Sequence, residues 1–159
     1  MSVTVYDGRY VAVDGLTTWG DIRRSFSKSR WDGGGRNKLL TYTGGVEEGL
    51  FLMDWYEKGA DPATWPAFQD NEKRWTTLVV FGGGKHRDVI EYNQVCLPLA
   101  IGEPFFAWGA GREIALGALS HGASAQEAAE IVCRIKTDCG LPIYLYDLEN
   151  PGEMEVFDG

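Results

Sequence analysis

Apolar and polar residues alternate at the start of the chain in the pattern of two short β-strands. Residues 2–6 and 9–13 are rich in β-branched and aromatic side chains, and Asp7-Gly8 separates them. An Asp-Gly pair between two such runs is a strong signal for a β-hairpin, because both residues accept the backbone angles of a tight turn. We therefore expect the chain to enter a strand at its second residue, with no leader ahead of it.

The next part of the sequence predicts one strand and one helix. Residues 21–38 are polar and irregular, with three successive glycines, whereas residues 39–43 form the short apolar run of a buried strand. Apolar residues then recur at helical spacing from Gly44-Gly45 through residue 58, and Gly59 is placed to end this helix. The face that we expect to be buried consists of Val46, Leu50, Met53 and Trp55.

A second hairpin is expected in the middle of the chain. Residues 61–71 contain two prolines and are predicted to form a loop. Residues 75–81 and 87–92 are strand-like runs on either side of three glycines. Residues 97–101 are a further apolar run, expected to be buried, and residues 105–108 extend this strand-rich region.

Two helices and a strand complete the pattern. The first helix is predicted over residues 110–120, and the second begins at Ser124. Ser124 and Glu127 have the spacing of a capping box, in which each side chain binds a free backbone N–H of the first turn. Residues 143–148 read as the last strand. The expected apolar face of the second helix is formed by Ala128, Ile131, Val132 and Ile135.

Length and element order together indicate one layered domain. A chain of 159 residues, 44% of them apolar and 24% charged, suits a single globular domain. Helices grouped around antiparallel strands favour layers of helix on sheet over a parallel, doubly wound arrangement. We assign residues 1–148 to an α+β domain and residues 149–159 to a loose, acidic C-terminal tail.

Charge and cysteine content narrow the class of partner. A net charge of −8 argues against a nucleic-acid surface, and the basic cluster between residues 23 and 38 is interrupted by three glycines. Cys96, Cys133 and Cys139 are odd in number and have no paired spacing, as expected of reduced thiols in a cytoplasmic protein. No apolar stretch approaches the roughly 20 residues of a membrane span. We therefore expect no membrane partner. His86 and His121 lack neighbours at metal-ligand spacing, so no metal ion is expected either.

Ser2 is the candidate nucleophile. Removal of Met1 leaves Ser2 with a free α-amine beside its own hydroxyl, and an amine with a reference pKa of about 7.7–8.0 is a suitable general base for that hydroxyl. The simpler interpretation of Ser2 alone is a small residue that begins a strand. The residues that follow decide between the two interpretations.

The strand Val11-Ala12-Val13-Asp14 resembles the second strand of proteasome β-subunits and of the bacterial peptidase HslV, where an Asp closes the same apolar run. Lys28 matches the buried Lys that follows this acid in the family, and Thr43-Gly44-Gly45 matches the double glycine ahead of a helix. The segments 99–102, 108–111 and 115–124 are similar to the strand-to-helix end of the family, and especially to its small, phage-type members.

This resemblance implies the fold and mechanism of N-terminal-nucleophile (Ntn) hydrolases. The implied fold is a four-layer αββα sandwich, in which two antiparallel sheets face each other between helices. Ser2 is then nucleophile and base, Asp14 and Lys28 tune its reactivity, and the backbone N–H of Gly44 stabilises the oxyanion. Thr18 and Gly45 fall at substrate-binding positions. The family needs no cofactor, acts on peptides or proteins and assembles from copies of its subunit.

The sequence departs from this pattern at several positions. Ala110 stands where the family has a Ser between two glycines. Alignment on Gly140-Leu141-Pro142 places Lys136 at a family acid and Cys139 at a family hydroxyl, whereas a shift of two residues brings Asp138 close to the acid position. Ser2 itself replaces the more usual Thr, and retention of Met1 blocks its amine.

Two functions follow from these observations. The first is a proteasome-like amide-bond hydrolase, or peptidase, that uses Ser2. The alternative is a catalytically degenerate relative that keeps the fold as an assembly or interaction module, with a phage gene as one possible source.

Overall fold

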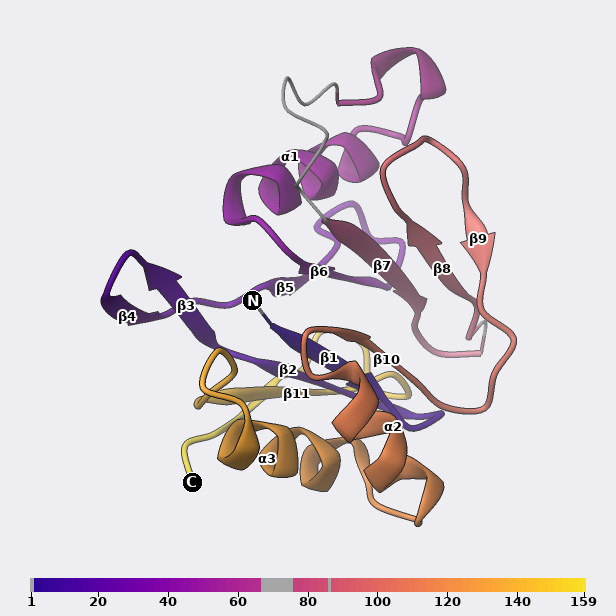
Figure 1. Ribbon diagram of the computed structural model, residues 1–159. Helices are drawn as coiled ribbons and strands as arrows, with labels where there is room; N and C mark the ends of the chain where they lie inside the picture. Colours follow the sequence, from indigo (N-terminus) through magenta and orange to yellow (C-terminus); the bar gives the residue numbers. More distant parts are fainter. Residues whose placement is uncertain (1, 67–75, 86) are drawn as a thin grey trace.

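The computed structural model describes residues 2–66, 76–85 and 87–159 and contains two five-stranded antiparallel sheets (Figure 1). The first sheet, in the order β10-β1-β2-β11-β12, consists of β1 (Val3–Tyr6), β2 (Tyr10–Asp14), β10 (Phe106–Gly109), β11 (Ile143–Asp147) and β12 (Glu155–Phe157). The second, in the order β5-β6-β7-β8-β9, consists of β5 (Ser29–Trp31), β6 (Lys38–Thr43), β7 (Thr77–Gly82), β8 (Val89–Tyr92) and β9 (Leu99–Ala100). A separate ribbon pairs β3 (Leu16–Trp19) with β4 (Ile22–Ser25). The helices are α1 (Val46–Glu57), the 3₁₀ turn η1 (Pro62–Thr64), α2 (Arg112–Ser120) and α3 (Ala125–Ile135).

Three clusters of buried side chains define four layers. One cluster, which includes Val5 and Val132, lies between the first sheet and helices α2 and α3. A second, which includes Val13 and Phe81, lies between the two sheets. A third, which includes Leu52, lies between the second sheet and α1. Figure 1 shows α1 on one outer side and α2 with α3 on the other, so the predicted αββα sandwich is confirmed.

The strands are apolar on both faces because each sheet is covered on both sides. In β2, Ala12 packs under the helices while its neighbour Val13 packs between the sheets. In β6, Leu39 packs between the sheets while Leu40 packs under α1. Successive side chains of a strand point to opposite faces, so a strand in an inner layer needs an apolar residue at nearly every position.

The predicted hairpin at the start of the chain is present, and Asp7 fixes its turn. The Asp7 carboxylate accepts hydrogen bonds from the backbone N–H groups of Arg9 (3.0 Å) and Tyr10 (2.7 Å) through Oδ1. Its Oδ2 accepts from the N–H of Ala125 (2.9 Å), the first residue of α3. Gly8 has φ +103°, a conformation that is costly for residues with a side chain. One short side chain therefore forms the turn and anchors the start of a helix.

The capping box at the start of α3 is confirmed, but its predicted buried face is only partly correct. Ala128 and Val132 are fully buried, whereas Ile131 and Ile135 are 36% and 62% exposed. The helix rests on the sheet through its small residues, including Ala129, which allow close approach. The two isoleucines consequently lie toward solvent.

In helix α1, too, the buried face differs from the predicted one by a rotation about the helix axis. Met53 and Trp55 are buried as predicted, but Leu50 is 37% exposed. The contact with β6 is made at Gly49, where a Cβ would overlap the ring of Tyr42. The absence of a side chain at Gly49 thus sets which face of α1 meets the sheet.

Three other expectations need correction. Residues 21–38, predicted to be irregular, contain β4 and β5. The run at 97–101 is not buried, because β9 is an edge strand in which Leu99 is 41% exposed. Residues 149–159 are not a loose tail throughout, since β12 pairs with β11. The predicted features at Met1, residues 67–75 and His86 lie outside the described residues.

None of the helices in residues 2–66, 76–85 and 87–159 is long and apolar enough to cross a bilayer.

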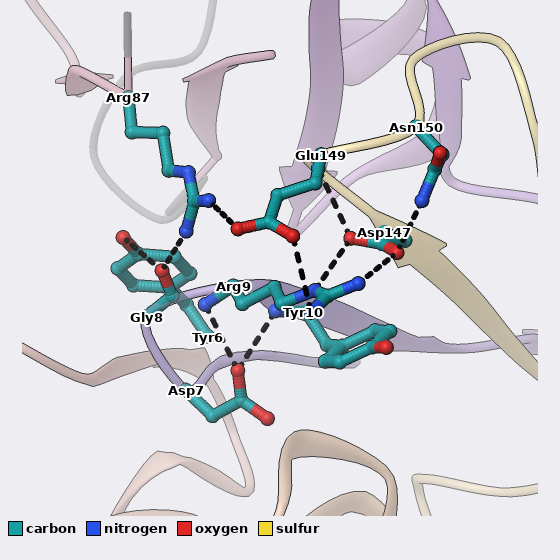
Figure 2. A network of polar contacts seen from close by, with 9 residues as sticks. All are labelled: Tyr6, Asp7, Gly8, Arg9, Tyr10, Arg87, Asp147, Glu149 and Asn150. Carbon is teal, nitrogen blue, oxygen red and sulfur yellow. Dashed lines mark hydrogen bonds and ion pairs between the residues drawn. The ribbon is translucent and has the colours of Figure 1, made fainter. Parts of the chain in front are cut away.

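A network of charges ties the β1–β2 turn to the end of β11 (Figure 2). The Arg9 guanidinium donates to both carboxylate oxygens of Asp147, at 3.0 and 2.8 Å, and pairs with Glu149 at 3.0 Å. Arg87 pairs with the other oxygen of Glu149 and donates to the carbonyl oxygen of Gly8 at 3.1 Å. The hydrogen bonds from Arg9 hold the pKa of Asp147 well below its usual range.

We expect Asp147→Asn to lower the free energy of unfolding near pH 7, by less than about 1 kcal/mol because the pair is partly solvated. Since the folded-state pKa is depressed, the stabilisation is complete above the ordinary Asp pKa and is lost as pH falls through the folded value. Urea titrations at neutral and acidic pH will therefore show a difference between variant and wild type that shrinks on acidification. Asp54→Asn, in an exposed pair with Lys58, is the control. A difference that does not change with pH contradicts the prediction.

Candidate active site

The Asp14 carboxylate, at the end of β2, lies at the centre of a buried polar cluster. Its side chain is fully buried. Oδ1 accepts hydrogen bonds from the backbone N–H of Val3 at 2.9 Å and from Lys28 Nζ at 3.0 Å. Oδ2 accepts from the backbone N–H of Gly140 at 3.1 Å. A buried carboxylate is costly unless it is paired and hydrogen-bonded, and here both conditions are met.

Gly15, which follows Asp14, lies in close contact with Pro142 and Tyr144. A Cβ on Gly15 would lie 2.7 Å from the carbonyl oxygen of Pro142 and 2.8 Å from the ring of Tyr144. The N–H of Gly15 donates to the same carbonyl at 2.7 Å. The close approach of the two backbones thus holds Asp14 against the segment that leads into β11.

Lys28 reaches Asp14 from just before β5, in the opposite sheet. Its side chain is 3% exposed, and its carbonyl oxygen accepts a hydrogen bond from the N–H of Tyr42 at 3.0 Å. Because Lys28 and Val3 donate to the same carboxylate oxygen, the ammonium lies next to the backbone that follows Ser2. The predicted proximity of Asp14 and Lys28 is therefore present in the structure.

Ser2 is held by its backbone. Its carbonyl oxygen accepts a hydrogen bond from the N–H of Ala110 at 2.8 Å, and the residue is 1% exposed. Gly109 has φ +94°, and a Cβ there would overlap the Ser2 carbonyl group. The Ser2 Oγ is buried and has no hydrogen-bond partner among the described residues. A buried hydroxyl without a partner costs roughly 1–3 kcal/mol, so its presence calls for a structural or functional reason.

The double glycine predicted as the oxyanion loop follows Thr43, the last residue of β6. The methyl group of Thr43 lies close to Gly109, the residue against which the Ser2 carbonyl packs, so the end of β6 approaches the start of the N-terminal strand. Gly44 has φ +112°, which only glycine adopts readily. Gly45 is the N-cap of α1, and its N–H donates to Thr76 Oγ1 at 3.1 Å. The positive end of the α1 dipole thus begins at this loop.

Thr18, the other predicted substrate-binding residue, lies on the exposed ribbon rather than in the buried cluster. It is in β3, directly opposite Arg23 of β4. Its side chain makes no hydrogen bond in the described part of the chain. The structure therefore does not bring Thr18 together with Asp14 and Lys28.

The departures from the family pattern have distinct structural consequences. Ala110 contributes a backbone N–H to Ser2 but has no hydroxyl. Lys136 ends α3 and pairs with Asp138 at 3.6 Å, and neither side chain contacts Asp14 within the described residues. Burial raises the pKa of the Cys139 thiol to about 12, so this thiol stays protonated at neutral pH.

Sequence reasoning missed the donor at Gly140. The family pattern concerns side chains at the positions of Lys136, Asp138 and Cys139, whereas the contact with Asp14 is made by the backbone N–H of Gly140. The one available signal was the Gly-Leu-Pro sequence just before the last strand, since glycine often marks a close approach of backbone to another group.

The described residues contain no group of three or more His, Cys, Asp or Glu side chains arranged to hold a metal ion.

Comparisons with known proteins identify the fold of the chain. No protein-family model matches the chain, and no curated protein matches it. BPH of Thiobacillus denitrificans in complex with epoxomicin matches with a TM-score of 0.66 at 18% identity, over 100% of both chains. A second structure of the same BPH matches with a TM-score of 0.64 at 19% identity, over 93% of this chain and 98% of that one. A Gly-1 mutant of Anbu from Hyphomicrobium sp. strain MC1 matches with a TM-score of 0.72 at 12% identity, over 100% of this chain and 88% of that one. The chain therefore has the Ntn-hydrolase fold of proteasome-like proteins.

Proposed function

We propose that the protein is a proteasome-like Ntn hydrolase that cleaves amide bonds with Ser2 after removal of Met1. One observation carries this proposal: the buried Asp14–Lys28 pair is hydrogen-bonded to the backbone of Val3, the residue after Ser2, and the Ser2 hydroxyl is buried without a partner among the described residues. A fold shared with BPH and Anbu supports the general class. Catalysis then uses groups of this chain, the substrate and water.

The free α-amine of Ser2 acts as the general base in this mechanism. It takes the proton from Oγ as Oγ attacks the carbonyl carbon of the scissile amide. The same proton passes to the leaving amine nitrogen as the C–N bond breaks, which leaves an ester on Ser2. Water then attacks the ester and gives a proton to the α-amine, which passes it to Oγ as the ester C–O bond breaks, so that the acid product, the free hydroxyl and the free amine are restored.

The groups around Ser2 stabilise the charges that develop in these steps. The positive charge of Lys28, held by Asp14, favours the ionised form of the Ser2 hydroxyl. The N–H of Gly44, at the start of the α1 dipole, stabilises the oxyanion of the tetrahedral intermediate. Thr18 and Gly45 position the peptide backbone.

The alternative, a non-catalytic assembly or interaction module, is favoured by Ala110. This residue supplies no hydroxyl to the amine of Ser2 and makes only a backbone contact with it. Lys136, directed to Asp138, also leaves the family acid without a counterpart. The two functions differ in one covalent property, the presence of a free amine on Ser2.

We expect the intact mass of the protein from its native host to lack Met1, and purified protein to hydrolyse peptides. Ser2→Ala keeps a small second residue and so permits removal of Met1, but it loses the hydroxyl and reduces kcat/KM by roughly 10³-fold or more. Ser120→Ala, at the end of α2, is the matched control with unchanged activity. Because the neighbour BPH is known in complex with epoxomicin, this compound is a direct probe, and an adduct is expected on wild type but not on Ser2→Ala. Full retention of Met1 would exclude the mechanism and leave the interaction module.

Lys28→Met is expected to reduce kcat/KM by about 10²-fold and to destabilise the fold by roughly 3 kcal/mol, because Asp14 is left as an unpaired buried charge. The double variant Lys28→Met, Asp14→Asn removes that charge and is expected to recover part of the stability without recovering activity. Urea unfolding and peptide hydrolysis measured on the same samples separate the two effects. Activity that returns together with stability would show a purely structural role for Lys28.

We also propose that the subunit assembles with copies of itself. The tip of the β3–β4 ribbon carries Trp19 and Ile22, which are 74% and 66% exposed. Large apolar side chains with this exposure are typical of contact residues between subunits. Native mass spectrometry is expected to show an oligomer that Trp19→Ser weakens, whereas Arg112→Gln, on the exposed start of α2, leaves it intact. A monomer at all concentrations contradicts this proposal.

A further inference from the structure

A cavity of about 370 Å³ lies between the β3–β4 ribbon and the segment that leads into β11. It is separate from the Ser2 hydroxyl and is lined by side chains of the ribbon, of α3 and of that segment. The residues that matter for its chemistry are Leu16, Arg23, Arg24, Cys133, Gly140 and Leu141.

The charge of this cavity is positive. Arg23 and Arg24 both line it, and no Asp or Glu is among its lining residues in the described part of the chain. Neither guanidinium makes a hydrogen bond or ion pair with another described residue, although other arginines, such as Arg9 and Arg30, do. Burial raises the pKa of the Cys133 thiol to about 12, so the thiol adds no negative charge at neutral pH. Two unpaired cations share one cavity in a protein whose net charge is −8.

The cavity is connected to the candidate active site through Gly140. Arg23 Nη2 lies 3.3 Å from the Cβ position of Gly140, and the N–H of Gly140 donates to Asp14 Oδ2. Leu16, on the other wall, follows Asp14 by two residues and is 4% exposed. A single backbone residue therefore separates the Arg23 guanidinium from the carboxylate that orders the N-terminal strand.

The register of the ribbon explains how Arg23 reaches this position. Leu16 lies opposite Ser25, and Thr18 lies opposite Arg23. Opposed residues of an antiparallel pair share a face, and alternate pairs share the same one. Leu16 is buried, so the base of this face meets the domain, whereas Thr18 and Arg23, nearer the tip, are exposed. The Arg23 guanidinium reaches back from this exposed position to Gly140.

We propose that this cavity is a binding subsite for a carboxylate of the peptide substrate, so that the enzyme prefers peptides with an acidic residue near the scissile bond. The proposal rests on the proposed function, because it takes the peptide to lie across Ser2 and Thr18. Arginine binds a carboxylate through two parallel N–H···O bonds, which are shorter and stronger than neutral hydrogen bonds. The net negative charge of the protein does not prevent this, since distant charges are screened beyond about 8 Å at physiological salt while the contact pair is not.

The test measures binding without catalysis, on full-length Ser2→Ala protein. The probes are short, alanine-rich, fluorescently labelled peptides with both ends capped, in which one Glu is moved through successive positions. Matched peptides carry Gln in place of Glu, and a further Gln peptide has a free C-terminal carboxylate. Fluorescence anisotropy gives the dissociation constants. The variants are Arg23→Gln, Arg23→Lys and Arg24→Gln, with Arg134→Gln on the outer side of α3 as the control of equal charge change.

We expect at least one Glu position to bind about tenfold more tightly than its Gln counterpart. This preference is lost in Arg23→Gln, reduced in Arg23→Lys and Arg24→Gln, and kept in Arg134→Gln. A stronger effect of the free C-terminus than of any Glu position assigns the subsite to a terminal carboxylate. Equal affinities for all Glu and Gln peptides, or a preference that persists in Arg23→Gln, overturns the proposal. Because Ser2→Ala does not react, a preference found here stands even if wild type hydrolyses nothing, whereas hydrolysis without a preference leaves the proposed function and removes the subsite.

Discussion

The buried carboxylate of Asp14 connects more parts of this structure than any other side chain in the candidate site. It receives hydrogen bonds from β1, from the segment before β11 and from Lys28, which belongs to the opposite sheet. Each donor offsets part of the cost of placing a charge in the core. The carboxylate therefore fixes the relative positions of the N-terminal strand, the second sheet and the loop at Gly140. The geometry proposed for catalysis is a consequence of satisfying this one charge.

Two close contacts between backbone segments in this site require glycine, because a side chain at either position would not fit. Gly109 allows the Ser2 carbonyl to approach β10, and Gly15 allows the end of β2 to pack against Pro142. These contacts leave no room for a Cβ, so they place Ser2 within tight limits. A hydroxyl at Ala110 is not required for that placement, because its N–H alone holds Ser2. In the proposed mechanism, positioning and proton transfer are thus carried by different groups.

The sequence predicts those features that depend on local pattern. The hairpin at Asp7-Gly8 and the capping box at Ser124 are confirmed because each is formed by residues a few positions apart. The Asp14–Lys28 pair was predicted through resemblance, and the structure brings the two residues together. The pairing of β12 with β11 and the β3–β4 ribbon were missed, since short polar strands carry no strong periodicity. Gly140 was missed for another reason: its contribution is a backbone N–H, which has no signature in side-chain chemistry.

The β3–β4 ribbon adds a further constraint on how this site works. It belongs to neither five-stranded sheet, yet Leu16 anchors it to the domain directly after Asp14. Any shift of the ribbon therefore moves Arg23 relative to Gly140 and acts on the same loop that binds Asp14. In the proposed substrate complex, a charge bound at Arg23 would lie one backbone residue away from the hydrogen bonds that order the N-terminal strand. Recognition of the substrate and alignment of Ser2 would then be two effects of the same packing.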